Sequence, residues 1–327
     1  MDALSEVLRS FRLHGSIYSS WEFTAPWGMS FRPQTAASFH FIRSGQCELI
    51  RVDGQRATLV TGDVAVVFDG SGHRICDNGA SRAESLETIL ARQPPGVVPR
   101  KHGGGGLACR MICGKFDLDE RESGPATLRH LPHLVHIPHD ESARMRSFTA
   151  TMDLLAGEVQ QRESGSERAA SLLTEMLLIQ VVRYVLATND LSTSAGWVEG
   201  LRDRQIGIAL AAIHGEPEKP WSVDSLAEKT GLSRSVFAER FAERVGRTPM
   251  SYLAEWRLHV AARLLRETHL SVSEIYQRLG YGSAASFDRA FKRTHRLSPL
   301  VYRRRSAERD EGARLAVVPS PQRRRSG

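Results

Sequence analysis

The sequence predicts an α+β protein in which an N-terminal β-barrel and a helical linker precede an all-α C-terminal domain. Two observations support this fold class. Short runs of alternating apolar and polar residues, separated by glycines, fill the first third of the chain. Near the C-terminus, one helix-turn-helix pattern occurs twice, about fifty residues apart. A length of 327 residues and a hydrophobic content of 41% allow two domains that each bury a core.

The strand-like runs extend from Ser16 to about Lys115, with glycine-bearing turns between them, a rhythm typical of a small barrel or jelly roll. The segment from Gly62 to Asn78, Gly-Asp-Val-Ala-Val-Val-Phe-Asp-Gly-Ser-Gly-His-Arg-Ile-Cys-Asp-Asn, is similar to the second signature of the cupin barrel. Phe68 stands where that signature has a proline. We therefore expect a cupin-like domain with its helical linker over residues 1–190.

Many cupins bind a metal through histidines and a glutamate, and the resemblance makes His40, Glu48 and His73 candidate ligands. The His-x-His pair of the first signature is missing, because Ile42 fills its second position. Ordinary barrel histidines that hydrogen-bond a strand-end turn are the preferred interpretation. We predict no metal, no cofactor and no catalytic residue. A cupin metalloenzyme with an accessory DNA-binding domain is the alternative.

Four cysteines are too few for a disulfide framework and fit a reducing compartment. Cys109 and Cys113 fall on one face of a predicted strand, about 13 Å apart, so they cannot pair there without rearrangement. Buried, inert cysteine is the commoner state, but neighbouring cationic residues can lower a thiol pKa. A small organic ligand and cysteine oxidation both remain open as the effector event. The candidate effector or redox residues are His40, His73, Cys76, Cys109 and Cys113.

The run Gly103 to Gly106 has no following Lys-Ser/Thr and no helix start, so it predicts a flexible hairpin loop and not a phosphate loop. Two helices follow, around 145–155 and 171–184. The second is apolar over much of its circumference, so it must pack against the barrel, another helix or a second protomer, and we expect a homodimer. No apolar run reaches the roughly 20 residues of a membrane span, and the N-terminus does not resemble a secretory signal. We expect a cytoplasmic protein without a membrane partner.

The C-terminal repeat is internally consistent. Val223, Leu226 and Gly231 recur 49 residues later, whereas Phe237 and Phe241 recur 50 residues later, so the second turn is one residue longer. Each copy reads as a helix, a glycine-bearing turn and a second helix whose two phenylalanines face the core. Residues 250–265 carry apolar residues at three-to-four spacing and predict one amphipathic helix that connects the copies.

The block 204–305 resembles the DNA-binding domain of the AraC/XylS family of transcriptional regulators. The resemblance rests on Trp221-Ser-Val-x-x-Leu-Ala, Gly231-Leu-Ser-x-x-x-Phe-x-x-x-Phe and Gly246-x-x-Pro, and on Gly280-Tyr and Pro299 in the second copy. Tyr276 stands where the family has a small alanine, and Arg296 where it has a glycine. The resemblance implies no enzyme but a sequence-specific regulator, an activator in most such families, that binds double-stranded promoter DNA and contacts RNA polymerase.

Charge is distributed as this interpretation requires. Residues 200–305 hold 19 Lys and Arg against 11 Asp and Glu, whereas residues 1–199 hold 20 against 23. A basic block beside a slightly acidic one suits phosphate binding, because cationic side chains release counterions from DNA. We expect the remaining residues, 306–327, to form a disordered tail.

The family's base-reading positions fall on the second helix of each copy. Arginine pairs bidentately with guanine, glutamate accepts from cytosine, and alanine contacts a thymine methyl. The predicted base-reading residues are Arg234, Ser235, Ala238 and Glu239 in the first copy and Ala284, Ala285, Ser286, Asp288 and Arg289 in the second. The predicted phosphate contacts, which position without specifying, are Arg240, Arg244, Lys292 and Arg293.

Overall fold

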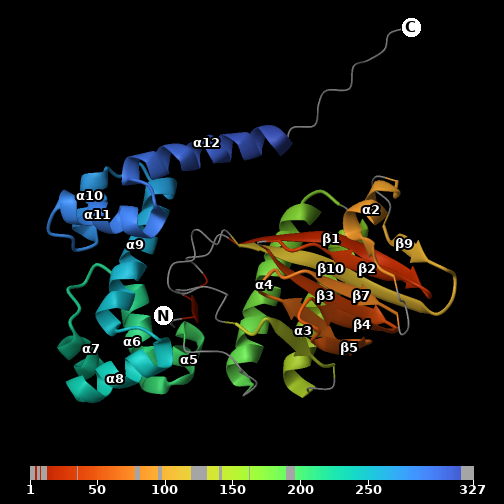
Figure 1. The fold of residues 1–327 in the computed structure, drawn as a ribbon, viewed down its shortest axis with the longest axis horizontal. Coiled ribbons are helices and arrows are strands. Elements are labelled where there is room, and N and C mark those ends of the chain that lie inside the picture. Colours follow the sequence, from red (N-terminus) through yellow and green to blue (C-terminus); the bar gives the residue numbers. More distant parts are fainter. Residues whose placement is uncertain are drawn as a thin grey trace, which may run out of the picture. The chain divides into compact units, whose positions relative to one another are not determined.

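The computed structural model describes residues 4–5, 8, 13–34, 36–77, 82–94, 98–118, 131–139, 142–161, 163–188 and 196–317. The chain divides into two compact units. One comprises residues 11–120 and 127–202, which we call the barrel unit; the other comprises Asp203–Gly327 with the short pieces 1–10 and 121–126, and we call it the DNA-binding unit. Figure 1 shows the strands of the first and the helices of the second.

The barrel unit contains a six-stranded sheet in the order β11-β6-β3-β10-β1-β9 and a five-stranded sheet in the order β5-β4-β7-β2-β8. The β1–β10 and β3–β10 pairs are antiparallel. The strands are β1 (Leu13–Thr24), β2 (Gly28–Phe31), β3 (Ala37–Ser44), β4 (Gln46–Arg51), β5 (Arg56–Val60), β6 (Val64–Val67), β7 (His73–Cys76), β8 (Glu84–Ser85), β9 (Arg100–Gly103), β10 (Ala108–Leu118) and β11 (Leu134–Ile137).

The core of this unit lies between the two sheets. Trp21, Phe23 and Met111 from the larger sheet and Met29 and Leu49 from the smaller one are fully buried within one apolar cluster. Side chains on a strand alternate between its two faces, so every second residue of each run enters this core. The predicted cupin-like barrel is confirmed.

The Gly103 to Gly106 segment is not a loose hairpin. The backbone N–H groups of Gly104 and Gly106 donate to the carbonyls of Thr24 and Ala25, at 2.8 Å each. A Cβ at Gly103, whose φ is +132°, would lie 1.9 Å from the Thr24 carbonyl oxygen. The glycines therefore permit close backbone contact with the end of β1, which fixes the segment in place. The expectation of a hairpin was wrong, because β9 and β10 both pair with β1 and not with each other.

Helices cover the six-stranded sheet (Figure 1): α3 (Ser142–Gln161) and α4 (Ser166–Ala187) pack on each other and on β1. The unit also holds α2 (Leu86–Ala91) and α5 (Trp197–Arg202). By length and composition α4 could cross a membrane. Leu177, Leu178 and Val181 are nevertheless fully buried within the unit, which is the burial expected of a core helix.

Within residues 203–317, the DNA-binding unit is built of helices and the turns between them, as predicted. Caps bound its helices: the Ser233 and Ser283 side chains accept from backbone N–H groups three residues on, and Gly246 ends a helix at φ 77°. Its helices are α6 (Arg204–Gly215), α7 (Val223–Thr230), α8 (Arg234–Val245), α9 (Pro249–Glu267), α10 (Val272–Arg278), α11 (Ala284–His295) and α12 (Pro299–Val317).

The repeated phenylalanines form the core of each helix-turn-helix. Phe237 and Phe241 in α8, and Phe287 and Phe291 in α11, have no solvent exposure. The connecting helix α9 packs against both copies, since it contacts α8 on one side of the repeat and α10 and α11 on the other. Placing two short units on one helix fixes their separation through the rigidity of that helix.

The two departures from the family pattern are accommodated differently. Tyr276 is half-buried, and its ring lies 6.2 Å from the ring of Phe287, so it extends the aromatic core of the second copy. Arg296 follows α11 at φ 59° and is the one positive-φ residue other than glycine among the described residues. It adopts the left-handed conformation that Gly246 adopts in the first copy, at a steric cost that glycine does not carry.

The end of the chain differs from expectation. Helix α12 continues past Arg305, where we expected a disordered tail to begin, as far as Val317. Arg304 and Glu308, one turn apart, form an ion pair at 3.9 Å across this boundary, and an i,i+4 pair of this kind favours helix. The last part of the predicted tail, residues 318–327, lies outside the described residues.

Candidate functional site

In the first copy, the predicted base-reading residues lie on the outer face of α8. Arg234, Ser235 and Glu239 are exposed and Ala238 is half-buried, opposite the buried phenylalanines. The Arg234 guanidinium donates to the Asp224 carboxylate of α7 at 2.8 Å, with more than 60% of both side chains exposed. An ion pair this exposed contributes little free energy, so the Arg234 guanidinium can leave Asp224 for another acceptor.

In the second copy, Ala284, Ala285 and Arg289 are exposed on α11, whereas Ser286 and Asp288 are half-buried. The Asp288 carboxylate forms an ion pair with the Lys292 ammonium, one turn further along α11, at 2.7 Å. The short side chains of Ala284 and Ala285 allow another molecule to approach the start of α11 closely. The corresponding surface of α8 instead carries the charged side chains of Arg234 and Glu239.

Three of the four predicted phosphate contacts, Arg244, Lys292 and Arg293, are exposed. Arg240 differs, because its Nε donates to Asp203 at 2.6 Å and its Nη1 donates to Gln205 at 2.8 Å. Neither acceptor was singled out from the sequence. An aspartate directly before a helix is a recognisable cap, but its second role as a partner for α8 depends on tertiary packing.

Inside the barrel, three candidate effector residues form one chain of contacts. His40 Nε2 lies 2.9 Å from His73 Nε2, His40 Nδ1 lies 3.2 Å from Cys113 Sγ, and His73 Nδ1 lies 3.3 Å from the Ser71 carbonyl oxygen. A carbonyl only accepts, so His73 Nδ1 carries its proton and His73 Nε2 accepts from His40. His40 Nδ1 then accepts from the Cys113 thiol.

The pKa shifts agree with a chain of neutral hydrogen-bonding groups. Burial lowers the pKa of His73 to about 4, and burial followed by repulsion from His73 lowers that of His40 well below its usual range. Burial raises the pKa of the Cys113 thiol. The three side chains are therefore neutral near pH 7, and Cys113 is held as an unreactive thiol.

This arrangement does not fit a cupin metal centre. His40 uses its two nitrogens on different partners, so His73 and Cys113 lie on opposite sides of its ring and cannot converge on one ion. Glu48 faces Arg56 instead, at 3.7 Å. Within the part of the chain that the structure describes, no three His, Cys, Asp or Glu side chains form a group that could hold a metal ion.

A contact between two thiols, those of Cys47 and Cys109, was not predicted from the sequence. Cys47 and Cys109, from opposite sheets, share a hydrogen bond that lowers the pKa of Cys109 against the opposing effect of burial. The same hydrogen bond, together with burial, raises the pKa of Cys47. Burial also raises the pKa of Cys76. All four cysteines are free and buried, and Cys109 alone has a depressed pKa among them.

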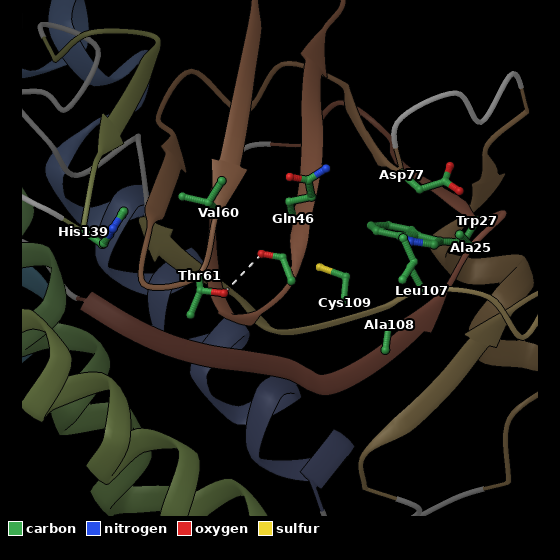
Figure 2. A pocket seen from close by; sticks show the side chains of 11 residues that line it. Ala25, Trp27, Gln46, Val60, Thr61, Asp77, Leu107, Ala108, Cys109 and His139 are labelled. Atoms are coloured by element: carbon green, nitrogen blue, oxygen red, sulfur yellow. Dashed lines mark hydrogen bonds between the residues drawn. The ribbon is translucent and has the colours of Figure 1, made fainter.

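Cys109 lines a pocket of about 640 Å³ at one end of the barrel. Figure 2 places Cys109 in the middle of the lining, between Thr61 on one side and Leu107 on the other. The walls are mainly apolar, and a few polar groups are set among them, as in sites for small organic molecules. The lining residues are Ala25, Trp27, Gly45, Gln46, Val60, Thr61, Asp77, Leu107, Ala108, Cys109 and His139.

Comparisons with known proteins agree with both halves of the fold. A family profile described as "Cupin" matches residues 2–187, and one described as "Helix-turn-helix domain" matches residues 226–305. A solved DNA-binding domain of AdpA in complex with a target DNA is 29% identical; the match covers 33% of this chain and 97% of that chain, with a TM-score of 0.31.

Relatives match over nearly the whole chain. The HTH-type transcriptional regulator AlkR of Acinetobacter baylyi is 30% identical over 94% of this chain and 100% of its own length. A putative AraC-like transcription regulator of Streptomyces lividans is 29% identical over 93% and 98%, and the RCS-specific HTH-type transcriptional activator RclR of Escherichia coli 25% identical over 93% and 98%. A cupin barrel joined to two helix-turn-helix units, matched end to end by these regulators, makes this chain a member of the AraC/XylS family of transcriptional regulators.

Proposed function

We propose that this regulator activates transcription in the cytoplasm by inserting α8 and α11 into successive major grooves of promoter DNA and by contacting RNA polymerase. We call α8 and α11 the reading helices. The observation that supports the proposal most directly is that α9, a single rigid helix, connects these two exposed helices. The 19 residues of α9 span about 28 Å, close to the roughly 34 Å repeat of B-DNA. One protomer would then read two half-sites about one turn apart.

The proposed base contacts follow from the exposed chemistry of each helix. Arg234 and Arg289 would each donate two hydrogen bonds to a guanine, and Glu239 would accept from a cytosine. Ser235 and Ser286 suit several bases, Asp288 suits cytosine, and Ala238, Ala284 and Ala285 suit thymine methyl groups. Arg244, Lys292 and Arg293 would bind phosphates.

Alanine substitution separates these roles. Arg234→Ala or Arg289→Ala should cost roughly 1–3 kcal/mol on the preferred duplex and relax specificity at one position. Arg293→Ala, the control at an exposed predicted phosphate contact, should weaken binding to all sequences and reduce the salt dependence by about one counterion. A uniform loss for Arg234→Ala would remove it from base reading.

We further propose that the pocket lined by Cys109 receives the effector, a small, largely apolar molecule, which shifts the population of DNA-binding states. Oxidation of Cys109 is the second candidate, because its thiol has a depressed pKa and lines the pocket. DNA binding measured with an apolar compound library and with hypochlorite distinguishes them. Cys109→Ser should abolish only the oxidant response, and Cys113→Ser should abolish neither.

A homodimer is part of the proposal. Leu172 and Met176, one turn apart on α4, expose 48% and 45% of their surfaces, whereas the opposite side of the helix is buried. A second copy packing on this face would bury both side chains. Sedimentation of the full chain should show a dimer that Met176→Glu dissociates, and a monomeric wild type at micromolar concentration would rule this out.

A further inference from the structure

Asp203 connects the start of the DNA-binding unit with its first reading helix. Its Oδ1 accepts from the backbone N–H groups of Gln205 and Ile206, at 3.0 and 3.2 Å, and so caps α6. Its Oδ2 accepts from Arg240 of α8 at 2.6 Å. Burial acts to raise the pKa of this carboxyl, yet donors from Ile206 and Arg240 hold it below its usual value. The two oxygens thus serve different helices.

Further contacts make this a two-point attachment of α8, which we call the Asp203 bridge. Arg240 Nη1 also donates to the Gln205 side-chain oxygen at 2.8 Å, and Arg244 Nε lies 3.8 Å from Asp203 Oδ2. The Asp203 side chain is 4% exposed. Two arginines one turn apart, held by one buried carboxylate, restrict rotation of α8 about its own axis.

Among the residues that the structure describes, no carboxylate holds the second reading helix in this way. Phe237 in α8 corresponds to Phe287 in α11, fifty residues on, and the same offset places Ala290 and Thr294 at the positions of Arg240 and Arg244. Neither side chain can form an ion pair with a carboxylate. The Asp203 bridge therefore belongs to the first copy and makes the two reading helices unequal.

We propose that Asp203 is a positioning residue for the first reading helix. The proposal rests on the function proposed above. The Asp203 bridge fixes the orientation of α8 about its own axis, and α11 does not share this attachment. Loss of the bridge therefore lowers the affinity for one half-site and not for both.

Asp203→Asn isolates the bridge, because asparagine retains the oxygen that caps α6 but replaces the oxygen that accepts from Arg240 with an NH2 group. The full chain is first used to select duplexes from a random pool, and the selected duplex is the probe. We expect Asp203→Asn to weaken binding about tenfold, with protection lost over one half-site only. Glu308→Gln, which removes the charge of the exposed partner of Arg304 on α12, is the matched control and should leave the affinity within about twofold.

Hydrogen exchange of the free proteins tests the bridge without DNA. Asp203→Asn should accelerate amide exchange in α8 but not in α11. Unchanged α8 exchange in Asp203→Asn would overturn the positioning role of Asp203.

The DNA-binding measurement separates failure of this inference from failure of the proposed function. Tighter binding by Asp203→Asn with a salt dependence raised by about one counterion would make Arg240 a phosphate contact that Asp203 restrains, which contradicts positioning. Selection of no duplex by the wild type would instead refute sequence-specific reading, and the half-site claim would fail with it.

Discussion

His259 lies on α9 in the core of the DNA-binding unit with 1% of its surface exposed. Among the described residues neither of its ring nitrogens finds a hydrogen-bond partner, and its ring lies 5.1 Å from that of Trp256. Burial, reinforced by nearby cationic groups such as Arg266, lowers its pKa from 6.5 to about 3. The native state therefore holds this imidazole neutral, whereas the unfolded chain protonates it in mild acid.

The size of the effect follows from these two pKa values. Because the native pKa is depressed, the stability is complete above about pH 6.5 and declines as the pH falls toward 3. At pH 5 the unfolded state gains about 2 kcal/mol from protonating this one side chain, against about 0.2 kcal/mol at pH 7. His259→Leu removes the linkage and also removes a buried polar group without a partner, so the variant should be at least as stable at pH 7.

The measurement is urea denaturation of the full chain at both pH values, followed by hydrogen exchange of peptides from α9, which reports this unit alone. Wild type should lose about 2 kcal/mol more than His259→Leu between pH 7 and pH 5. His269→Gln, at an exposed position of the same unit, should behave as wild type. Equal losses in wild type and His259→Leu would refute the reasoning.

Three further substitutions test local features. Arg296→Gly should stabilise the second copy by about 1 kcal/mol, because glycine adopts φ 59° without steric cost, and Gly246→Ala should destabilise the first copy by a similar amount; exchange at the ends of α11 and α8 checks both. Gly103→Ala should lower the melting temperature of the barrel unit, since its Cβ would lie 1.9 Å from a β1 carbonyl oxygen. Phe287→Ala should cost about 3–5 kcal/mol, measured by urea denaturation, and a cost below 1 kcal/mol would contradict its core position.

The helices of the DNA-binding unit were predictable because their signals are local. Ser233, Ser283 and Gly246 mark helix ends within a few residues, and the phenylalanine spacing defines the buried face. The left-handed conformation of Arg296 has no local signal of its own, because arginine rarely adopts it. It could be inferred only from the glycine at the matching position of the first copy.

The interior of the barrel was less predictable, because its contacts join strands far apart in the chain. Alternation correctly placed Cys109 and Cys113 on one buried face of β10. It could not show that Cys113 meets His40 while Cys109 meets Cys47, since those pairings depend on sheet order and register. The Asp203 bridge was missed for the same reason: the cap is local, but its partner Arg240 lies 37 residues away.

The most direct test of the account is selection of duplexes from a random pool by the purified full chain at near-physiological salt, with and without hypochlorite. Two short half-motifs with centres roughly 10 base pairs apart should be enriched, and Arg234→Ala should relax one of them while Arg289→Ala relaxes the other. Enrichment no greater than that of a random duplex in either condition would contradict reading by α8 and α11.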